Sequence, residues 1–364
     1  MTSQGQGRIS NPETSLETDP RAHPKLIAAL QPAGLAANLP PLPEGLDPSA
    51  PLDAIAQYYA QIEPLMPTIF GNVPQDLPSD TAFSSLKRSE EFTTAPDGHK
   101  IKLTIYSPAN QSGPLPAVIY LHGGGMTVLK TELPHHIRWV QSLAATGTIA
   151  VLVDFRNAWS EEYGWNPFPT GLNDCAAAVK WVDEHRKEFN ISKLILNGES
   201  GGGNLVTATA LKANKEGWTH TIDGVYACCP MISGGYSWDR EMKLKTYPSL
   251  VECDGYIISC ASMAMMAKTY DPEDKYADDP LAFPLRAKEE DLKGLPPHVL
   301  AMDELDPLRD EGIAYWRKLA AAGVKVMGRV NLGVVHGFEM IFRGVLPEAS
   351  LETIWDVKRF AQSL

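Results

Sequence analysis

The chain has 364 residues, 44% of them hydrophobic, which is enough to build one large domain around a buried core. A formal net charge of −12 argues against nucleic acid and anionic membrane surfaces as partners, because both select for basic patches. The N-terminus has no apolar signal-peptide core, no run approaches a membrane span, and the five cysteines form no C-x-x-C pattern. We therefore expect a cytoplasmic protein with free buried thiols.

The first quarter of the sequence contains no pattern of a parallel strand. Residues 1–20 are rich in Ser, Thr, Gly and Gln, so we expect them to be disordered. Residues 21–85 contain many prolines and short helical patterns such as 52–62, which predicts an N-terminal helical cap segment. A hairpin over 92–106 follows, with Pro96-Asp97-Gly98 as its turn.

From residue 116 onward, strand and helix patterns alternate along the chain. Strands are predicted at 116–121, 149–154, 193–199, 223–229, 297–302 and 324–332, with helices at 170–189, 202–215, 310–322 and 350–363. This alternation predicts an α/β fold with a mostly parallel central sheet and helices on both faces. The alternation is interrupted between residues 230 and 296. We therefore expect a helical cap insertion there, dividing the core into 86–229 and 297–364.

The predicted strand at 116–121 ends in a glycine run, His122-Gly123-Gly124-Gly125. Consecutive glycines after a strand let backbone N–H groups turn toward a ligand with no side chain in the way. Such groups can hold the oxyanion of a tetrahedral intermediate, together with the N–H of the residue that follows a nucleophile. The ordinary alternative is a structural glycine loop. His122 is interpreted as a loop anchor and not as a chemical participant.

A pentapeptide of the form G-x-S-x-G spans Gly198–Gly202 and centres on Ser200. It lies between an apolar strand pattern and an alanine-rich helical pattern, which is the context of a nucleophile elbow. The motif alone is weak evidence. The upstream glycine run occurs in the expected order, so Ser200 is predicted to be a nucleophile and Gly201 to supply an oxyanion N–H.

A general base is expected after the serine, because α/β-hydrolases place the triad in the order Ser, acid, His. Three histidines follow Ser200. His220 lies in a polar, surface-like stretch, and His298 begins an apolar run and is interpreted as structural. His336 follows a late strand on a predicted loop and is therefore the expected base. The earlier pair His135-His136 lacks further ligands at metal spacing and is predicted to be on the surface.

The acid that orients this base should be held rigidly near the end of the preceding strand. Asp303, Glu304 and Asp306 all follow the strand predicted at 297–302. Asp306 fits best, and Asp303 is the alternative. A solvated carboxylate or a helix cap is the ordinary interpretation of either residue.

Several segments resemble the hormone-sensitive-lipase-like family of α/β-hydrolases, from about residue 88 to the C-terminus. They are HGGGMTVLKT from His122, VDFRNAW from Val153, GESGGGNL from Gly198, LDPLRDEGIA from Leu305 and VNLGVVHG from Val330. The resemblance implies an α/β-hydrolase fold with Ser200 as nucleophile, Asp306 as acid and His336 as base. It also implies that Gly123, Gly124 and Gly201 form the oxyanion hole. Many members carry Asp where this chain has Glu199, and Ala where it has Gly201.

These observations predict a serine carboxylesterase that cleaves small to medium esters or a lactone through an acyl-enzyme on Ser200. No metal or organic cofactor is expected, and the expected partners are the substrate and a second copy of the chain in a homodimer. Met126, Met265 and Met266 are candidate pocket residues, because methionine adapts to irregular ligands. The alternative for the cap methionines is core packing.

Two other classes remain open at this point. An acyltransferase would use the same residues and differ only in the alcohol that intercepts the acyl-enzyme. A non-catalytic small-molecule receptor is the other alternative, because a fold does not guarantee chemistry. Receptor members of the family typically lack the base, whereas this chain has His336.

Overall fold

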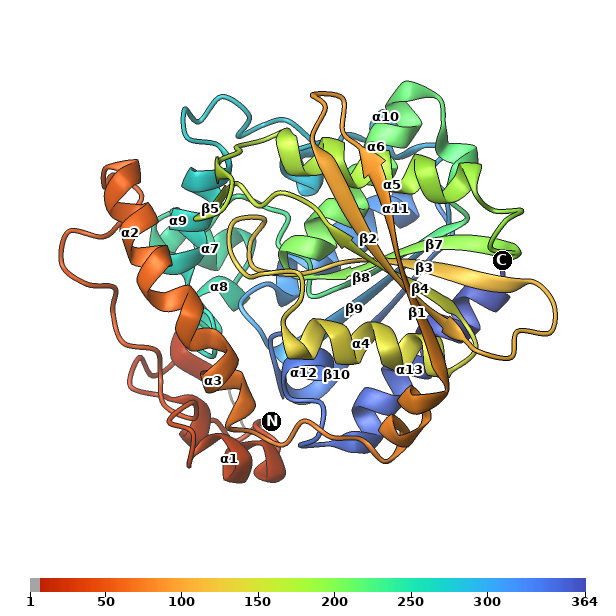
Figure 1. The fold of residues 1–364 in the computed structure, drawn as a ribbon. Coiled ribbons are helices and arrows are strands. Elements are labelled where there is room, and N and C mark those ends of the chain that lie inside the picture. Colours follow the sequence, from red (N-terminus) through yellow and green to blue (C-terminus); the bar gives the residue numbers. More distant parts are fainter. Residues whose placement is uncertain (1–6) are drawn as a thin grey trace.

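A mostly parallel sheet of eight strands forms the centre of the computed structural model, which describes residues 7–364 (Figure 1). The strands are β1 (Leu86–Thr94), β2 (Lys100–Pro108), β3 (Leu115–Leu121), β4 (Ile149–Asp154), β7 (Ile191–Glu199), β8 (Gly224–Cys228), β9 (His298–Leu305) and β10 (Val326–Val335). Their order across the sheet is β1-β2-β4-β3-β7-β8-β9-β10. Strand β2 pairs in antiparallel fashion with β1 on one side and with β4 on the other; the five remaining pairs, from β4 to β10, are parallel. The predicted fold class is confirmed.

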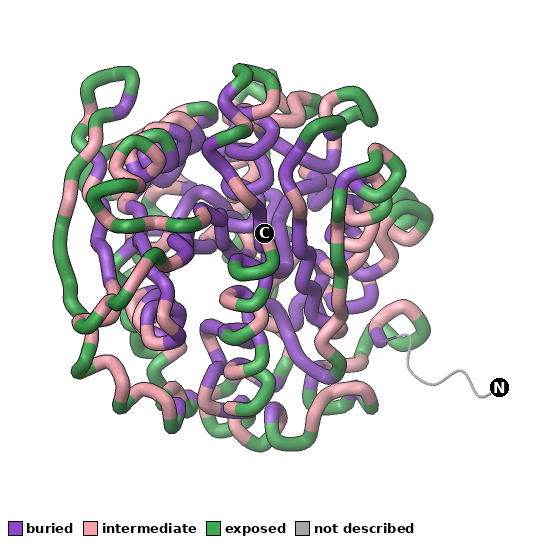
Figure 2. Tube along the Cα trace, turned by 90° about the vertical axis from the view of Figure 1, so that its right-hand side faces the viewer, coloured by how far each residue is buried: buried purple, intermediate pink, exposed green. Residues whose placement is uncertain are grey.

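Helices cover both faces of this sheet, which buries its inner strands on two sides. The helices α5 (Thr170–Glu184), α6 (Gly201–Glu216) and α11 (Arg309–Ala321) pack against one face, and α4 (Pro134–Ala145) and α13 (Pro347–Gln362) against the other. Strands buried on both faces are apolar throughout, as in β3, where every residue after Leu115 is buried. Figure 2 shows the buried chain concentrated in this interior.

Short helices from two distant parts of the sequence gather at one end of the sheet (Figure 1). The N-terminal ones are α1 (Pro24–Leu30), α2 (Leu52–Ile62) and α3 (Met66–Gly71), and those after β8 are α7 (Arg240–Thr246), α8 (Ser249–Glu252) and α9 (Cys260–Tyr270). The short helix α12 (Phe338–Ile341) follows β10, and α10 (Glu289–Leu292) lies apart from this group, against α6 and α11. A two-stranded ribbon of β5 (Trp159–Ser160) and β6 (Gly164–Trp165) lies beside them. Ile55 and Tyr59 of α2 share a buried cluster with Met265 of α9 and with Val128 and Trp159.

The predicted disorder of residues 1–20 is wrong for residues 7–20; residues 1–6 lie outside the described part. Leu16 is fully buried, and Asp19 is paired with Arg21 at 2.7 Å. The His23 N–H donates to the Gly333 carbonyl of β10 at 2.9 Å. The composition suggested disorder because the segment has little core of its own, but contacts to distant residues hold it in place.

All five cysteines are free and buried, as expected from the sequence. Among residues 7–364, no helix has both the length and the apolar character needed to cross a bilayer.

Candidate active site

Ser200 sits on the turn that joins β7 to α6, in a backbone conformation that side chains rarely adopt. Its φ is 54° and its ψ is −119°, and it caps the N-terminus of α6. The Ser200 N–H donates to the Cys228 carbonyl, and the Ser200 carbonyl accepts from the Met231 N–H, both at 3.0 Å. These contacts hold a strained turn whose side chain stands at the carboxyl end of the sheet.

The neighbouring glycines make this turn sterically feasible. A Cβ on Gly198 would lie 2.5 Å from the Gly202 carbonyl oxygen, and one on Gly202 would lie 1.9 Å from the Leu121 carbonyl oxygen. Both distances are far below van der Waals contact, so any larger residue would push β3, β7 and α6 apart. The G-x-S-x-G spacing is therefore required by backbone packing around the serine.

His336 and Asp306 meet at the ends of adjacent strands. His336 directly follows β10 and Asp306 directly follows β9, and Asp306 Oδ2 lies 2.8 Å from His336 Nδ1. Asp306 Oδ1 accepts the Leu308 N–H at 2.9 Å, so both carboxylate oxygens are held. Burial lowers the pKa of His336, but Asp306, joined by the Glu199 and Glu339 carboxylates, opposes that effect, and the net pKa is raised. The carboxylate thus stabilises an imidazolium in a buried place.

Asp303, the alternative acid, is engaged elsewhere. Its Oδ1 accepts a hydrogen bond from Asn331 Nδ2 at 3.0 Å, and the same amide donates to Glu339 Oε1 at 2.6 Å. Burial, followed by the nearby Glu339 and Asp306 carboxylates, raises the pKa of Asp303 well above its usual range. The geometry therefore favours Asp306 over Asp303 as the partner of the histidine.

The oxyanion assignment needs one correction, at Gly123. The Gly123 N–H donates to Glu199 Oε1 at 2.7 Å, and the Tyr120 hydroxyl donates to the same oxygen at 2.9 Å. Burial raises the pKa of Glu199 to about 8, and the two hydrogen bonds oppose that rise. Glu199 thus ties the glycine loop to the nucleophile turn, and Gly123 has no free N–H for a ligand.

Three other N–H groups remain for an oxyanion. Within the described chain, those of Gly124, Gly125 and Gly201 have no hydrogen-bond partner. A Cβ on Gly201 would lie 2.6 Å from the Gly125 nitrogen and 2.4 Å from the Met126 nitrogen. The loop and the first turn of α6 are therefore close enough to present their N–H groups to one atom, and Gly125 is a candidate donor in the place predicted for Gly123.

We expect Gly124→Val to lower ester turnover by about 10² to 10³-fold, the cost of losing one oxyanion donor. Gly124 has a φ of +97°, and a Cβ there would lie 2.0 Å from the Val128 carbonyl oxygen, so the loop must move. Steady-state kinetics beside a melting curve would check this. Gly113→Val is the matched control, because Gly113 has a φ of +121° but open space around it. Wild-type turnover in a folded Gly124 variant would show that the loop is structural only.

The predicted surface position of His135-His136 is wrong, because both residues lie in the first turn of α4 and are buried. The His136 ring stacks on His122 with centroids 4.9 Å apart, and the His135 ring meets Phe70 of α3 edge-on at 5.3 Å. Burial lowers the pKa of both His122 and His135 to about 4, so these rings are neutral packing groups. The anchoring role expected for His122 fits its bond from Nδ1 to the Gly123 carbonyl at 2.8 Å.

The N-terminal arm, residues 7–23, reaches the two segments that carry Asp306 and His336. Arg21 pairs with Glu252 at 2.7 Å, and Glu252 pairs with Arg309 at 2.6 Å. Arg309 also donates to the Glu304 carbonyl, and the Glu304 carboxylate accepts the Gly333 N–H, both at 2.8 Å. This chain of contacts buttresses the ends of β9 and β10.

The three candidate pocket methionines occupy different places. Met126 is buried in the main core, and Met265 is fully buried in the cluster with α2 and Trp159. Met266 is only partly buried, and its Sδ would lie 2.5 Å from a Cβ on Gly125, so it contacts the glycine loop directly.

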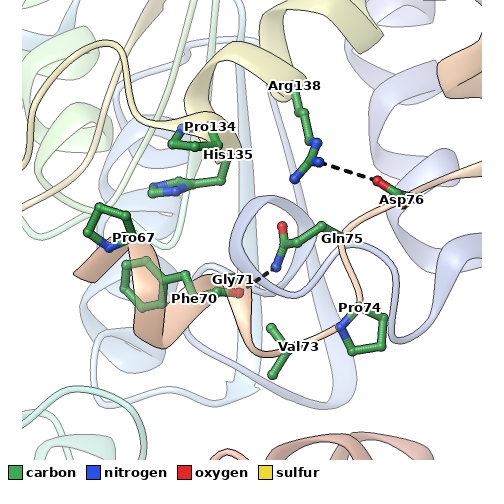
Figure 3. A pocket seen from close by; sticks show the side chains of 10 residues that line it. All are labelled: Pro67, Phe70, Gly71, Val73, Pro74, Gln75, Asp76, Pro134, His135 and Arg138. Atoms are coloured by element: carbon green, nitrogen blue, oxygen red, sulfur yellow. Dashed lines mark hydrogen bonds and ion pairs between the residues drawn. The ribbon is translucent and has the colours of Figure 1, made fainter. Parts of the chain in front are cut away.

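A cavity of about 490 Å³ between α3 and α4 (Figure 3) is lined by residues such as Phe70, His135 and Arg138, none of which was predicted for the site.

Sequence reasoning missed the Glu199 contact, the arm and the buried histidines. Glu199 was visible as a carboxylate at the end of an apolar strand, which is a signal of a satisfied buried acid. The partners of the arm are more than 200 residues away in sequence, and no local pattern indicates them.

The fold and this constellation define the chain as an α/β-hydrolase. A family profile described as alpha/beta hydrolase fold matches residues 118–340, more than half of the chain. Carboxylesterase NlhH of Mycobacterium tuberculosis is 31% identical over 271 residues, which cover 73% of this chain and 80% of that protein. Esterase LipI of the same organism is 27% identical over 83% of this chain and 95% of its own length.

Solved structures similar to this chain are also esterases. One described as brefeldin A esterase, a bacterial homologue of human hormone sensitive lipase, has a TM-score of 0.94 and 46% identity, covering 98% of this chain and 97% of its own. Esterase Est22 with p-nitrophenol has a TM-score of 0.80 and 33% identity, covering 95% and 99%. The chain belongs to the hormone-sensitive-lipase-like family of α/β-hydrolases, and it is a carboxylic ester hydrolase.

Proposed function

We propose that the chain is a serine esterase that cleaves small to medium carboxylic esters, or a lactone, through an acyl-enzyme on Ser200. The observation that carries this proposal is the His336–Asp306 hydrogen bond of 2.8 Å, at the same edge of the sheet as the strained Ser200 turn. Unpaired N–H groups of Gly124, Gly125 and Gly201 support it, because they provide the donors that a tetrahedral intermediate needs.

In the first half of the reaction, Ser200 Oγ attacks the ester carbonyl carbon while His336 Nε2 accepts the serine proton. Asp306 holds Nδ1–H, which leaves Nε2 as the lone-pair nitrogen, and it stabilises the imidazolium that forms. The glycine N–H groups take the negative charge of the carbonyl oxygen. When the tetrahedral intermediate collapses, His336 returns the proton to the departing alcohol.

In the second half, water attacks the acyl-enzyme by the same route. His336 accepts a proton from the water and then donates it to Ser200 Oγ, which releases the acid and regenerates the serine. An alcohol in place of water would make the enzyme an acyltransferase with the same residues.

A panel of p-nitrophenyl esters of increasing acyl length, run beside brefeldin A, would test this proposal. Similarity to a brefeldin A esterase and to an esterase solved with p-nitrophenol supports these two choices. We expect turnover of the shorter esters and release of the free acid even when alcohol is added. No ester hydrolysis would contradict the proposed function, and ester products formed only with added alcohol would indicate the acyltransferase.

We further propose that the N-terminal segment and residues 230–296 form a cap over the serine. Their helices pack on one another through α2 and α9, next to the loop that carries Val128. Met266 contacts Gly125 and packs only against the edge of the cluster shared by α2 and α9, whereas Met265 is fully buried inside that cluster. We therefore assign the pocket role to Met266 and a packing role to Met265.

Met266→Ala should shift the relative rates for long and short esters by about 1–3 kcal/mol, the range for one altered apolar pocket contact. Met265→Ala should instead lower the stability of the fold by about 2–5 kcal/mol, because it empties a fully buried site. Kinetics across the ester panel and urea unfolding on both variants would separate the two roles. Unchanged length ratios for Met266→Ala would remove it from the pocket.

For assembly and location, we propose a cytoplasmic homodimer. Free buried thiols suit a reducing compartment. The terminal strand β10 exposes Met327 and Leu332, at 52% and 74% of their surface, and an apolar edge strand favours pairing with a second chain. Light scattering should give twice the monomer mass for the wild type and the monomer mass for Leu332→Lys. A wild-type monomer would contradict the dimer.

A further inference from the structure

Cys229 lies beside the histidine–aspartate pair, and the proposed mechanism does not use it. It is the first residue after β8, so the ends of three neighbouring strands bring Cys229, Asp306 and His336 together. One ligand atom from each, the thiol sulfur, a carboxylate oxygen and an imidazole nitrogen, lies within 4.8 Å of the other two. All three residues are buried, with at most 4% of the surface of any one exposed.

We propose that these three side chains form a binding site for a thiophilic divalent cation, Zn²⁺ or Cd²⁺, and that its occupancy switches the esterase off. Binding is independent of the reaction, whereas the inhibition rests on the proposed function. Sulfur, nitrogen and carboxylate oxygen are the donor set that Zn²⁺ prefers, and three protein ligands leave the fourth tetrahedral position for water.

The distances suit such a site after a small adjustment. Bonds of tetrahedral Zn²⁺ place its donor atoms about 3.3–3.6 Å apart. Asp306 Oδ2 and His336 Nδ1 are 2.8 Å apart now, so they need to separate slightly. The thiol sulfur lies within 4.8 Å of both partners and needs to come within about 3.6 Å of each. One thiolate and one carboxylate balance the two positive charges of the ion. The occupied site is therefore electrically neutral, which suits a buried position.

Metal binding and catalysis exclude each other through the tautomer of His336. An ion on Nδ1 leaves the single proton of the neutral ring on Nε2, and a protonated Nε2 cannot accept the proton of Ser200. The ion also takes the Asp306 carboxylate away from the ring. The proton balance is simple, since the Cys229 thiol releases one proton to solvent and the imidazole proton moves from Nδ1 to Nε2.

One further property follows from burial. Cations must enter a covered site, so inhibition should develop slowly and be reversed slowly by a chelator.

Binding is tested first with a protein that needs no activity. Ser200→Ala protein is titrated with Cd²⁺, and the ultraviolet charge-transfer band of a cadmium–thiolate bond is measured. We expect a band that is lost when Cys229→Ala is added and kept when Cys228→Ala is added. Cys228 is the matched control, because it is buried and adjacent but outside the cluster. A Ser200→Ala protein without any band, or one that keeps its full band without Cys229, would overturn the site.

Inhibition is tested on the active enzyme with Zn²⁺, each variant being compared with its own metal-free rate. We expect slow, chelator-reversible loss of activity in the wild type and in Cys228→Ala, and at least a tenfold weaker effect in Cys229→Ala. Should Cys229→Ala fold poorly by circular dichroism, Cys229→Ser replaces it. Equal inhibition with and without Cys229 would overturn the proposal. An absent esterase activity would instead contradict the proposed function while leaving the cadmium result to decide the site.

Discussion

Replacing Ser200 with alanine should lower ester turnover by about 10⁴-fold or more, because no other group can form the acyl-enzyme. The variant should fold at least as well as the wild type. Ser200 is held with a φ of 54° by hydrogen bonds of its own backbone, and those bonds do not involve the side chain. Stopped and steady-state assays on the same preparation, beside a melting curve, would measure both quantities.

A covalent label gives an independent check of the same residue. A fluorophosphonate probe should modify Ser200, and mass spectrometry of the digested protein should locate the adduct there. The label should be absent from Ser200→Ala. An adduct on another serine, or normal turnover by the alanine variant, would show that the nucleophile is assigned wrongly.

The second large effect is expected at Asp306. Asp306→Asn should lower the rate by about 10³ to 10⁴-fold, because an amide oxygen or nitrogen facing Nδ1 allows the wrong imidazole tautomer. Asp303→Asn is the matched control, since it is the same change on a carboxylate that contacts Asn331 and not the histidine. A larger loss for Asp303 than for Asp306 would reverse the assignment.

The dependence of activity on pH gives a second test of Asp306, because a general structural defect would not shift the acidic limb of the profile to lower pH. The Asp306 carboxylate raises the pKa of His336, and the base works only when neutral, so wild-type activity should fall as the pH drops through that raised pKa. Without the Asp306 carboxylate, burial still lowers the pKa of His336, and only the Glu199 and Glu339 carboxylates oppose it, so the pKa should fall. The acidic limb should therefore shift to lower pH in Asp306→Asn and stay in place in Asp303→Asn.

Local patterns in the sequence predict most of the central sheet. The strand over β4 and the α2 helix have the predicted bounds, and α5 ends earlier than expected, at Glu184. Ser200, Asp306 and His336 each come shortly after a predicted strand. Because parallel strands have their carboxyl ends at the same edge of a sheet, the sequence predicts that the three residues lie at that edge. Position in the sequence favoured Asp306 over Asp303 only weakly, because both carboxylates follow the strand predicted at 297–302, and the resemblance strengthened that choice. In the structure Asp303 lies within β9, and its contact with Asn331 separates it from Asp306, which contacts His336.

The errors share one physical cause, which is contact between residues distant in sequence. The Gly123 N–H donates its hydrogen bond to Glu199, a residue from another strand, and is therefore not available to a ligand. His135 and His136 form a polar pair in sequence, yet stacking on His122 and Phe70 buries them. Pairing across the fold can bury a polar side chain wherever its hydrogen bonds or ring contacts are provided, and no periodicity reveals those partners.

The N-terminal arm, which supports the ends of β9 and β10, also affects when an active enzyme can form during synthesis. A ribosome makes Arg21 early, but its partner Glu252 comes 231 residues later, and Gly333, whose carbonyl accepts the His23 N–H, comes 310 residues after His23. Contacts between such distant residues form late, because the intervening chain must first be made and closed. Catalytic competence should therefore arrive in one final step, with no hydrolytic activity in the incomplete chains that precede it.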